Sequence, residues 1–330
     1  MPPPETALER AQELAASVLP HHRDKRRMLV IVNPYATTVS DRLKNLVVYA
    51  LQSRYEVEAV DTEARAHATE LCREAAAEGY DVVVAFGGDG TVNEAANGLA
   101  GSDTPLTVLP GGSTNVLCRT LGIPSDVVDA TEHLLGVADR FHPARIDLGR
   151  AGDRYFTFTA GIGLDASVVE RVDAKPRLKA RLGEWFFTYA ALTTFTRRYL
   201  VNPPRVRAAI AGTEIEGVTV IVQNSDPYTY FGRRPILLCE DADSINGRLS
   251  AVVLKRATPF EIPTLIPRIF ANRPGAVTRH RQVEGFTDLK ELRVASIDES
   301  PFPLQVDGDY VGEFHELDFG VEPAALTIVS

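Results

Sequence analysis

The sequence predicts two domains of different fold class, an N-terminal α/β domain with a mainly parallel sheet and a C-terminal all-β, sandwich-like domain. Apolar, strand-like runs alternate with helix-like segments from Met28 to about residue 141. From about His142 the pattern changes to short β runs separated by turn residues. At 330 residues the chain also exceeds the usual size of a single hydrophobic core, so two domains are expected.

In the N-terminal half, the apolar runs have the length of buried strands, and the segments between them have helical spacing. The expected strands are residues 28–32, 55–62, 81–86 and 106–110, and the expected helices are residues 40–53, residues 64–78 and segments that begin near Thr91 and Asn115. Strands that alternate with helices form a parallel sheet covered on both faces. Ligands of such sheets lie at the carboxyl ends of the strands, and two glycine-rich turns of this sequence fall there.

The C-terminal half contains a series of short β candidates between turn residues, which is typical of a sandwich or a barrel. They are residues 144–150, 154–160, 205–211, 217–224, 247–254, 277–286, 291–297, 303–310 and 325–330. Residues 161–166 follow one of them and satisfy the G-x-G-x-x-A dinucleotide pattern. Because no clear βαβ unit follows, we interpret this segment as structural, with a place beside the acceptor pocket as its alternative.

The formal net charge of −9 argues against a protein that binds nucleic acid by neutralising its phosphates, so any basic surface must be local. The three cysteines are far apart and form no CxxC pair, which indicates neither a disulfide scaffold nor a zinc knuckle and fits a reducing compartment. The N-terminus lacks the apolar core of a signal peptide, and no apolar run approaches the roughly 18 residues of a spanning helix. We therefore expect a cytoplasmic protein that is soluble or peripheral to a membrane.

The two glycine-rich turns are residues 87–91, which read GGDGT, and residues 110–115, which read PGGSTN. Glycine permits positive φ and close approach of the backbone, so both turns can direct amide groups at phosphate. The first turn also carries Asp89, and a carboxylate repels phosphate unless a cation lies between them. A magnesium nucleotide supplies that cation.

These two motifs, with Asn93 and Glu94 after the first, resemble the diacylglycerol kinase catalytic family, which includes bacterial diacylglycerol kinases and the sphingosine and ceramide kinases. NAD kinases and phosphofructokinases share the GGDG element more distantly. Further elements occur in the family's order, and the resemblance covers residues 27–330. These elements are Asn33-Pro34, Thr62, Ile146-Asp147-Leu148-Gly149, Asn224-Ser225 and Val306-Asp307-Gly308-Asp309.

The resemblance implies an NAD kinase/diacylglycerol kinase-like fold with three parts. We expect an N-terminal extension over residues 1–26 and a nucleotide-binding domain over residues 27–141, to which about residues 316–330 return. A β-rich lipid-acceptor domain occupies residues 142–315.

The resemblance also implies which residues contact the nucleotide, because matching positions do so in relatives. The expected ATP-binding residues are Asn33, Pro34, Tyr35, Ala36, Thr37, Thr62, Gly87, Gly88, Asp89, Gly90, Thr91, Asn93, Glu94, Gly112, Ser113 and Thr114. Asp89 is also the expected Mg²⁺ ligand, partly through water, because magnesium dehydrates reluctantly. A plain helix N-cap is the alternative role for Asp89.

Phosphoryl transfer further requires a base near the acceptor hydroxyl. Asp307, on a sharp strand turn in QVDGDY, is the leading candidate, and the family's Asp-Gly-Glu or Asp-Gly-Asp element is interpreted in this way. Asp309 lies two residues on and on the same side of an extended chain, so it could share the catalytic role or the metal. An ordinary β-hairpin turn, which Asp-Gly favours, is the alternative.

The sequence departs from the family at two places. Many relatives have an aspartate after the asparagine of the second turn, whereas Asn115 is followed here by Val116, which removes a carboxylate from the metal and base network. Bacterial relatives also carry an acidic loop that binds a structural magnesium. In the matching residues 241–248, Asn246 stands where a second aspartate is expected, so we assign no metal there.

Together these features predict an ATP- and Mg²⁺-dependent lipid kinase that phosphorylates the hydroxyl of diacylglycerol or a related lipid alcohol, with no nucleic-acid partner. Basic and aromatic side chains within residues 172–195 suit peripheral contact with the inner face of a membrane, or alternatively core packing. A homodimer is a further alternative. Two other functions stay open: a kinase of a soluble acceptor, such as NAD or a sugar, and a catalytically weak nucleotide-binding regulator, which Val116 favours.

Overall fold

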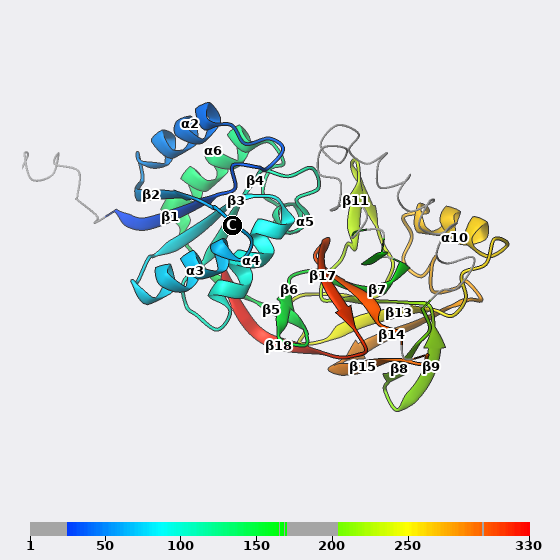
Figure 1. Ribbon diagram of the computed structural model, residues 1–330. Helices are drawn as coiled ribbons and strands as arrows, with labels where there is room; N and C mark the ends of the chain where they lie inside the picture. The colour runs from blue at the N-terminus through cyan, green and yellow to red at the C-terminus, as the bar shows by residue number, and fades with distance from the viewer. Residues whose placement is uncertain (1–24, 165, 168, 170–203, 299) are drawn as a thin grey trace, which may run out of the picture.

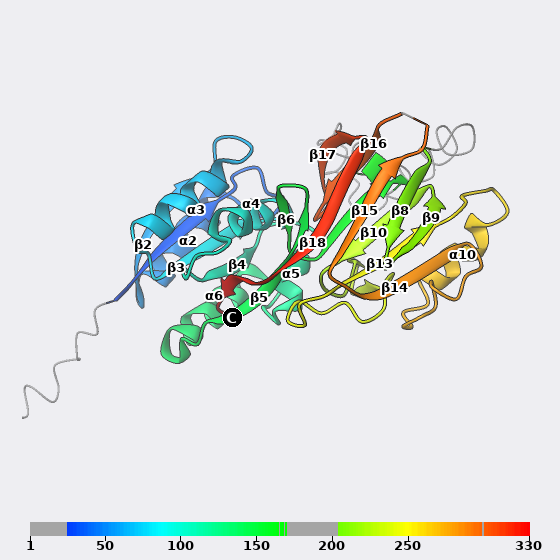
Figure 2. The ribbon, with the colours of Figure 1, turned by 90° about the horizontal axis from the view of Figure 1, so that it is seen from below.

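The computed structural model describes residues 25–164, 166–167, 169, 204–298 and 300–330. They form an α/β domain with a mostly parallel sheet and a β-sandwich-like domain beside it, joined by the long strand β18 (Glu316–Ile328) (Figures 1 and 2). The predicted fold class is confirmed. Residues 172–195, whose basic and aromatic side chains suggested membrane contact or core packing, lie outside the described residues.

Four parallel strands form the core of the N-terminal domain in the order β2-β1-β3-β4. They are β1 (Arg26–Val32), β2 (Tyr55–Asp61), β3 (Val82–Gly87) and β4 (Leu106–Pro110). Every residue of β3 and β4 is buried, as expected for central parallel strands with helices on both faces. All four strands were predicted within two residues of their observed bounds.

The helices follow the strands in alternation. They are α2 (Asp41–Leu51), α3 (His67–Ala77), α4 (Asp89–Leu99), α5 (Val116–Thr120), α6 (Val127–Val137) and the short 3-10 helix η1 (Ala138–Arg140). Right-handed crossovers place α2 on one face of the sheet and α3 and α4 on the other. Gly98 of α4 packs so closely on α3 that a Cβ atom there would lie 2.5 Å from Cys72 Cβ. The predicted helices correspond to α2 to α5, whereas α6 was not predicted.

In the C-terminal domain a six-stranded sheet has the order β14-β13-β10-β7-β16-β17. Its strands are β7 (Thr159–Gly163), β10 (Thr219–Gln223), β13 (Leu249–Leu254), β14 (Val283–Leu289), β16 (Phe302–Val306) and β17 (Asp309–Phe314). The facing sheet contains β5 (Ala144–Ala151), β6 (Arg154–Phe156), β8 (Val206–Ile210), β9 (Thr213–Gly217), β15 (Glu291–Ser296) and part of β18. The hairpin β11 (Thr229–Phe231) and β12 (Arg234–Ile236) and the helix α10 (Ile262–Ile269), which were not predicted, lie at one edge.

Apolar side chains between the two sheets make the sandwich core. Ile162 and Leu304 come from one sheet, and Val206, Ile210 and Val294 come from the other. All five are almost completely buried. This core is separate from that of the α/β domain, which is built around β1, β3 and β4. In the described part of the chain each domain therefore has its own core, as the length predicted, and a further cluster lies beneath β13 and β14.

Strand β18 belongs to both domains. Its first residues pair with β15 in the sandwich, and its last residue, Ile328, pairs in parallel with Leu106 of β4. The ten-stranded sheet is consequently continuous from β2 to β9 (Figure 2). The end of the chain thus returns to the first domain.

Asp147, in β5, fastens this junction. Its carboxylate accepts hydrogen bonds from the backbone N–H of Gly247 (2.6 Å) and of Ala324 (2.8 Å), and its own N–H donates to the carbonyl of Ser244 (2.6 Å). The side chain is buried. One carboxylate therefore holds the loop of residues 241–248 against an irregularity in β18.

We expect Asp147→Ala to lower the free energy of unfolding by about 1–3 kcal/mol, because two backbone N–H groups lose their acceptor. Asp103→Ala is the control: Asp103 pairs with Arg145 but is 95% exposed, so its loss should change stability by less than about 0.5 kcal/mol. Urea-induced unfolding measures both. Equal effects of the two substitutions would contradict the anchoring role of Asp147.

Candidate active site

The two glycine-rich turns lie side by side at the carboxyl ends of β3 and β4. The N–H of Gly111 donates to the carbonyl of Gly87 at 2.8 Å. A Cβ atom on Gly111 would lie 2.8 Å from Gly87 Cα, and one on Gly112 would lie 2.8 Å from Gly88 Cα. No side chain fits between the two turns, so their backbones are in direct contact. Both turns lie at the same edge of the sheet, as the sequence predicted.

Asp89 is the first residue of α4 and joins the two turns. Its Oδ1 atom accepts a hydrogen bond of 2.6 Å from the N–H of Val116, where α5 begins. Burial raises the pKa of Asp89 to about 7, and the carboxylates of Asp307 and Asp309 add to this rise, while backbone donors at Val116 and Asn115 oppose it. Asp89 therefore lies close to both carboxylates of the C-terminal domain.

Asp307 occupies the tight turn between β16 and β17, with a positive φ of 49°. Its side chain is only 1% exposed. Oδ2 accepts from Asn93 Nδ2 (2.8 Å) and from the N–H (2.7 Å) and hydroxyl (2.9 Å) of Thr157, and Oδ1 accepts from the N–H groups of Phe158 and Thr159 (3.0 Å each). Burial raises the pKa of Asp307, and these donors oppose that shift. Five donors occupy the lone pairs of this carboxylate.

Asp309 begins β17 and is half-buried. Its carboxylate lies against the backbone of Gly90, where a Cβ atom would collide with Asp309 Oδ2. Any larger residue at position 90 would displace the Asp309 carboxylate, so glycine there permits this carboxylate to contact the first turn. The first glycine turn consequently faces a carboxylate from the other domain.

Two of these carboxylates, Asp89 and Asp309, could share a divalent cation, whereas Asp307 is already hydrogen-bonded to five donors. Like charges in a partly buried site repel one another, and oxygen ligands are those that Mg²⁺ prefers. No group of three or more His, Cys, Asp or Glu side chains in the described part of the chain could hold a metal by itself. Mg²⁺ would therefore use one or two carboxylates and complete its shell with phosphate and water, as it usually does.

The predicted residues after β1 lie beside the glycine turns, and Thr62, after β2, lies next to the end of β1. Asn33 Nδ2 donates to the hydroxyl of Thr91 (3.0 Å), and Asn33 Oδ1 accepts from the N–H of Tyr35 (2.9 Å). The N–H of Thr38 donates to the carbonyl of Gly111 (3.1 Å). The turn of residues 33–38 is therefore fastened to both glycine turns, and it carries Pro34, Tyr35, Ala36 and Thr37. Thr62 is buried, and its N–H donates to Val32 at the end of β1.

Two predicted contact residues use their side chains within the protein. Asn93 is fully buried and binds Asp307 and the carbonyl of Tyr155. Glu94 accepts from the N–H groups of Ala66 (2.8 Å) and Ala68 (3.3 Å) at the start of α3. Asn93 links the two domains, and Glu94 fixes the loop before α3. In this structure both side chains therefore support the glycine turns through hydrogen bonds to other protein groups.

The second turn is held by its own asparagine. Asn115, with a φ of 50°, accepts from the N–H of Gly112 (2.9 Å) and donates to the carbonyl of Gly112 (2.8 Å). Ser113 lies exposed at the tip of this closed loop, and Thr114 is half-buried next to it. The loop is therefore held in one shape by its own hydrogen bonds.

Several residues of the interface were not predicted. Arg154 donates to Asn93 Oδ1 (2.7 and 3.1 Å), and Thr157 supplies two of the five donors to Asp307. Arg119 of α5 donates to the carbonyl of Gly232 and stacks on Tyr230, 3.6 Å from the ring centroid. Residues 154–160, predicted as one strand, are divided between β6 and β7, with residues 157–158 between them. The alternation of threonine with phenylalanine in this segment was the sequence signal that could have identified Thr157.

The departures from the family have structural explanations. Val116 is buried, and its N–H rather than a side-chain carboxylate contacts Asp89. Asp147 holds residues 241–248 through backbone groups alone. Residues 161–163 lie in β7, whose partners β10 and β16 are both antiparallel, so the G-x-G pattern is not part of a βαβ unit. Asp165 lies outside the described residues.

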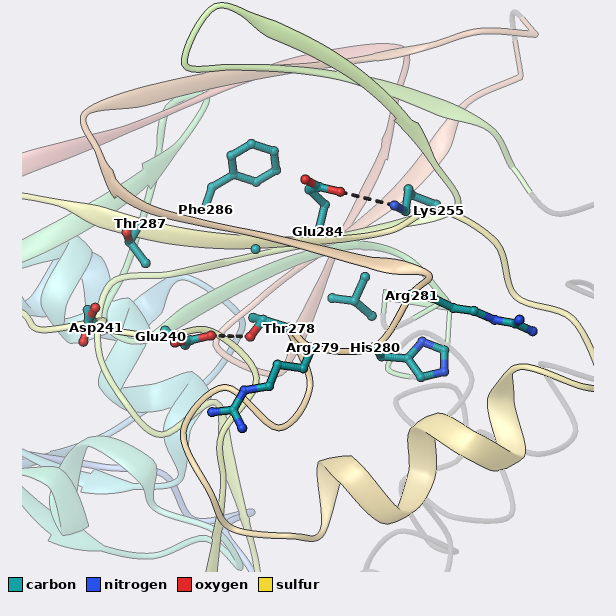
Figure 3. Close-up of a pocket in the computed structure, with 12 residues that line it drawn as sticks. Glu240, Asp241, Lys255, Thr278, Arg279, His280, Arg281, Glu284, Phe286 and Thr287 are labelled. Atoms are coloured by element: carbon teal, nitrogen blue, oxygen red, sulfur yellow. Dashed lines mark hydrogen bonds and ion pairs between the residues drawn. The ribbon is translucent and has the colours of Figure 1, made fainter.

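A separate polar hollow of ≈ 550 Å³ lies beside β13 and β14 (Figure 3). Lys255 pairs there with Glu284 (3.2 Å), and Glu240 accepts a hydrogen bond from Thr278. It shares no residue with the glycine turns, and its charges are partly neutralised by each other. It does not have the features of a triphosphate site.

Among the described residues, no helix is both long and apolar enough to cross a lipid bilayer. Residues 27–150 match the family model of the diacylglycerol kinase catalytic domain, and residues 159–330 match that of the YegS C-terminal NAD kinase beta sandwich-like domain.

Named relatives align over most of the chain. A protein named "Putative lipid kinase" from Streptococcus pneumoniae serotype 4 is 27% identical over 86% of this chain and 91% of its own. A diacylglycerol kinase of Staphylococcus aureus (strain bovine RF122 / ET3-1) is 27% identical over 88% of each chain. The crystal structure of a "putative diacylglycerol kinase" from Bacillus anthracis str. Sterne superposes with a TM-score of 0.72 at 26% identity, over 92% of this chain and 95% of that one.

The raised pKa of Asp89 predicts a pH dependence of stability for the metal-free protein. Between the ordinary pKa of 3.8 and about 7, the native state holds a proton that the unfolded state has released, so the free energy of unfolding falls as pH rises through this window. Asp89→Asn removes this titration. The stability of the variant relative to the wild type should therefore rise from pH 4 to pH 8, by about 2 kcal/mol because Asp89 is only partly buried.

Urea-induced unfolding of both proteins at several pH values, with a chelator present, measures this difference. Parallel pH profiles for wild type and Asp89→Asn would contradict the shift.

Proposed function

Because the chain belongs to the diacylglycerol kinase catalytic family, we propose that it transfers the γ-phosphoryl group of ATP to the hydroxyl of diacylglycerol or a related lipid alcohol. One observation carries the proposal. Asp89 from the first glycine turn meets Asp307 and Asp309 from the C-terminal domain, so metal-binding and proton-accepting groups lie beside two amide-lined turns.

In this proposal the nucleotide phosphates lie against the two glycine turns. Gly87, Gly88, Gly90 and Gly112 permit close approach of the backbone, and Thr91, Ser113 and Thr114 add hydroxyl groups. The turn of residues 33–37 and Thr62 border the same strand ends and serve the rest of the nucleotide. Asn93 and Glu94 support these turns through the hydrogen bonds that fix α4 to its neighbours.

Asp89 would hold Mg²⁺, with Asp309 as a second carboxylate within reach. A bound Mg²⁺ supplies positive charge that offsets the phosphate charge and the repulsion among the carboxylates. A pKa of about 7 means that the metal-free site keeps part of its Asp89 population neutral, and metal binding would favour the ionised form.

We assign the proton-accepting role to Asp309 in preference to Asp307. All of the strong acceptor positions of Asp307 are already occupied by five donors, so it has no lone pair directed at an incoming hydroxyl. Asp307 instead holds the turn that carries Asp309. As the acceptor oxygen forms its bond to the γ-phosphorus, its proton passes to Asp309, and the bond to the bridging oxygen breaks as ADP leaves with that electron pair.

The acceptor is proposed from the relatives, which are named as lipid or diacylglycerol kinases. A lipid acceptor implies work at a membrane surface, and a peripheral place at the inner face of the membrane belongs to the same proposal. The C-terminal domain also matches a family described as NAD kinase-like, so NAD is the soluble acceptor that the test must include.

We expect Asp309→Asn to reduce kcat about 100-fold or more while leaving the unfolding midpoint unchanged, because a base contributes this much and Asp309 is half-buried. Asp307→Asn should lower both activity and stability, because its amide would present N–H groups to existing donors. Asp288→Asn is the control, since Asp288 is exposed and its positive φ also suits asparagine.

Transfer of labelled γ-phosphate from ATP into a total lipid extract, with NAD and sugars as parallel acceptors, measures these effects. Label in NAD or sugar but in no lipid would contradict the proposed acceptor. ATP binding without transfer to any acceptor would indicate a regulator. If Asp309→Asn keeps full activity, and Asp307→Asn loses activity without losing stability, then Asp307 is the general base.

Gly111→Ala tests the nucleotide site separately. The added Cβ atom would lie 2.8 Å from Gly87 Cα and force the two turns apart, so we expect Mg·ATP affinity to fall about tenfold or more. Gly136→Ala in α6, where a Cβ atom meets nothing within 4 Å, should keep full affinity. Titration calorimetry measures both, and equal affinities would exclude these turns as the phosphate site.

A further inference from the structure

The segment from Lys255 to Arg281 is positively charged, whereas the chain as a whole is negatively charged. This segment contains the cations Lys255, Arg256, Arg268, Arg273, Arg279 and Arg281 and a single carboxylate, Glu261, in a chain whose net charge is −9. Lys255 pairs with Glu284 and Arg281 with Glu261. Arg256 and Arg273 are exposed and form no ion pair with any described residue. A basic surface is therefore concentrated around α10.

Helix α10, within this segment, has apolar side chains on its buried face and on an adjoining exposed face. Ile262, Leu265 and Ile269 pack inward on the core beneath β13 and β14. Pro263, Ile266, Pro267 and Phe270 recur at spacings of three and four on the other face, and all four are exposed. A surface helix normally presents polar side chains to water, so this outer face has no explanation in the packing of the domain.

Neighbouring aromatic residues enlarge the exposed apolar face. Phe260, just before α10, is 85% exposed. Phe231, in the β11–β12 hairpin, lies edge-to-face with Phe270 at a centroid distance of 5.5 Å. The hairpin adds Arg233 and Arg234, both exposed. We call Phe231, Phe260, Pro263, Ile266, Pro267 and Phe270, with the exposed arginines Arg233, Arg234, Arg256 and Arg273, the α10 face.

We propose that the α10 face docks on the surface of an anionic lipid bilayer, with its aromatic and aliphatic side chains in the interface and its arginines at the headgroups. The positive charge of the α10 face favours an anionic bilayer as its partner. A second copy of the chain, in a two-fold contact, would bring two basic surfaces together, which is unfavourable. The overall charge of −9 would hold the rest of the molecule away from such a membrane, so docking would be confined to this face.

The α10 face is connected to the candidate active site. Gly232, next to Phe231, accepts the hydrogen bonds of Arg119, which stacks on Tyr230. Arg119 lies in α5, the helix whose first N–H binds Asp89. The inference rests on the proposed function, because a lipid acceptor must be reached at a membrane, and this connection would set the glycine turns at a fixed position relative to the bilayer.

The test is cosedimentation of the full chain with vesicles of phosphatidylcholine, with and without phosphatidylglycerol, in the absence of ATP. The wild type should bind only the anionic vesicles, and salt should weaken the binding. Phe260→Ser/Ile266→Ser and Arg256→Gln/Arg273→Gln should each weaken it about tenfold or more, since a basic residue or an interfacial apolar side chain contributes several-fold.

Matched controls come from the α/β domain. Leu46→Ser/Tyr49→Ser removes apolar side chains that are 58% and 78% exposed on α2, and Arg42→Gln/Arg73→Gln removes two exposed arginines of α2 and α3. Both should keep wild-type binding. Binding of wild type to neither vesicle, or equal binding by the α10 variants and the controls, would overturn the proposal. Sedimentation velocity tests the alternative. If Phe260→Ser/Ile266→Ser converts a dimer to a monomer but still binds vesicles, the α10 face is a contact between two copies of the chain.

A second readout separates this proposal from the proposed function. Phosphorylation of a short-chain diacylglycerol dissolved without vesicles should be the same in the wild type and in the α10 variants. Failure of the wild type to phosphorylate it contradicts the proposed function, whereas unchanged vesicle binding by the variants contradicts docking through the α10 face.

Discussion

The buried carboxylate of Asp307 fixes the β16–β17 turn within the C-terminal domain and links it to Asn93 of the α/β domain. A charge in the protein interior is tolerated only when it is fully hydrogen-bonded, and every donor to Asp307 comes from elsewhere in the chain, namely Asn93 of α4 and residues 157–159 at the start of β7. Separating the domains here would remove one of its five donors, Asn93, because the other four come from residues 157–159 of its own domain. The turn between β16 and β17 is consequently fixed beside the first glycine turn, and Asp309 is fixed with it.

Direct backbone contact between the two glycine turns is a second constraint on the site. Gly111 and Gly112 lie on Gly87 and Gly88 with no space for a side chain, while Asp89 and Val116 link the helices that follow. Burial and repulsion among the carboxylates together raise the pKa of Asp89 in this close arrangement. A site that gathers carboxylates beside two glycine-rich turns suits a cation and phosphate together, because the cation offsets the repulsion between carboxylate and phosphate.

The four strands of the α/β domain and its helices α2 to α5 could be predicted because their apolar patterns are local and strong, as in β3 and β4, whereas α6 was not predicted. The hairpin β11–β12 was not predicted because its strands have three residues each, too few to show a period. Helix α10 was not predicted because Pro263 and Pro267 argue against a helix despite the helical spacing of its apolar residues. The glycine turns and the acidic residues were found from motif order. The functions of Asn93 and Glu94 were not evident, because hydrogen bonds to Arg154, Asp307 and Ala66 join segments far apart in the sequence.

The arrangement is best tested by a crystal structure with Mg²⁺ and a non-hydrolysable ATP analogue. The triphosphate should lie against residues 87–91 and 111–114, with the metal bound to Asp89 directly or through water and with Asp309 facing the γ-phosphate. The Asp307 carboxylate should keep its five donors. A triphosphate bound elsewhere, for instance in the polar hollow beside β13 and β14, or a metal remote from Asp89, would contradict this site.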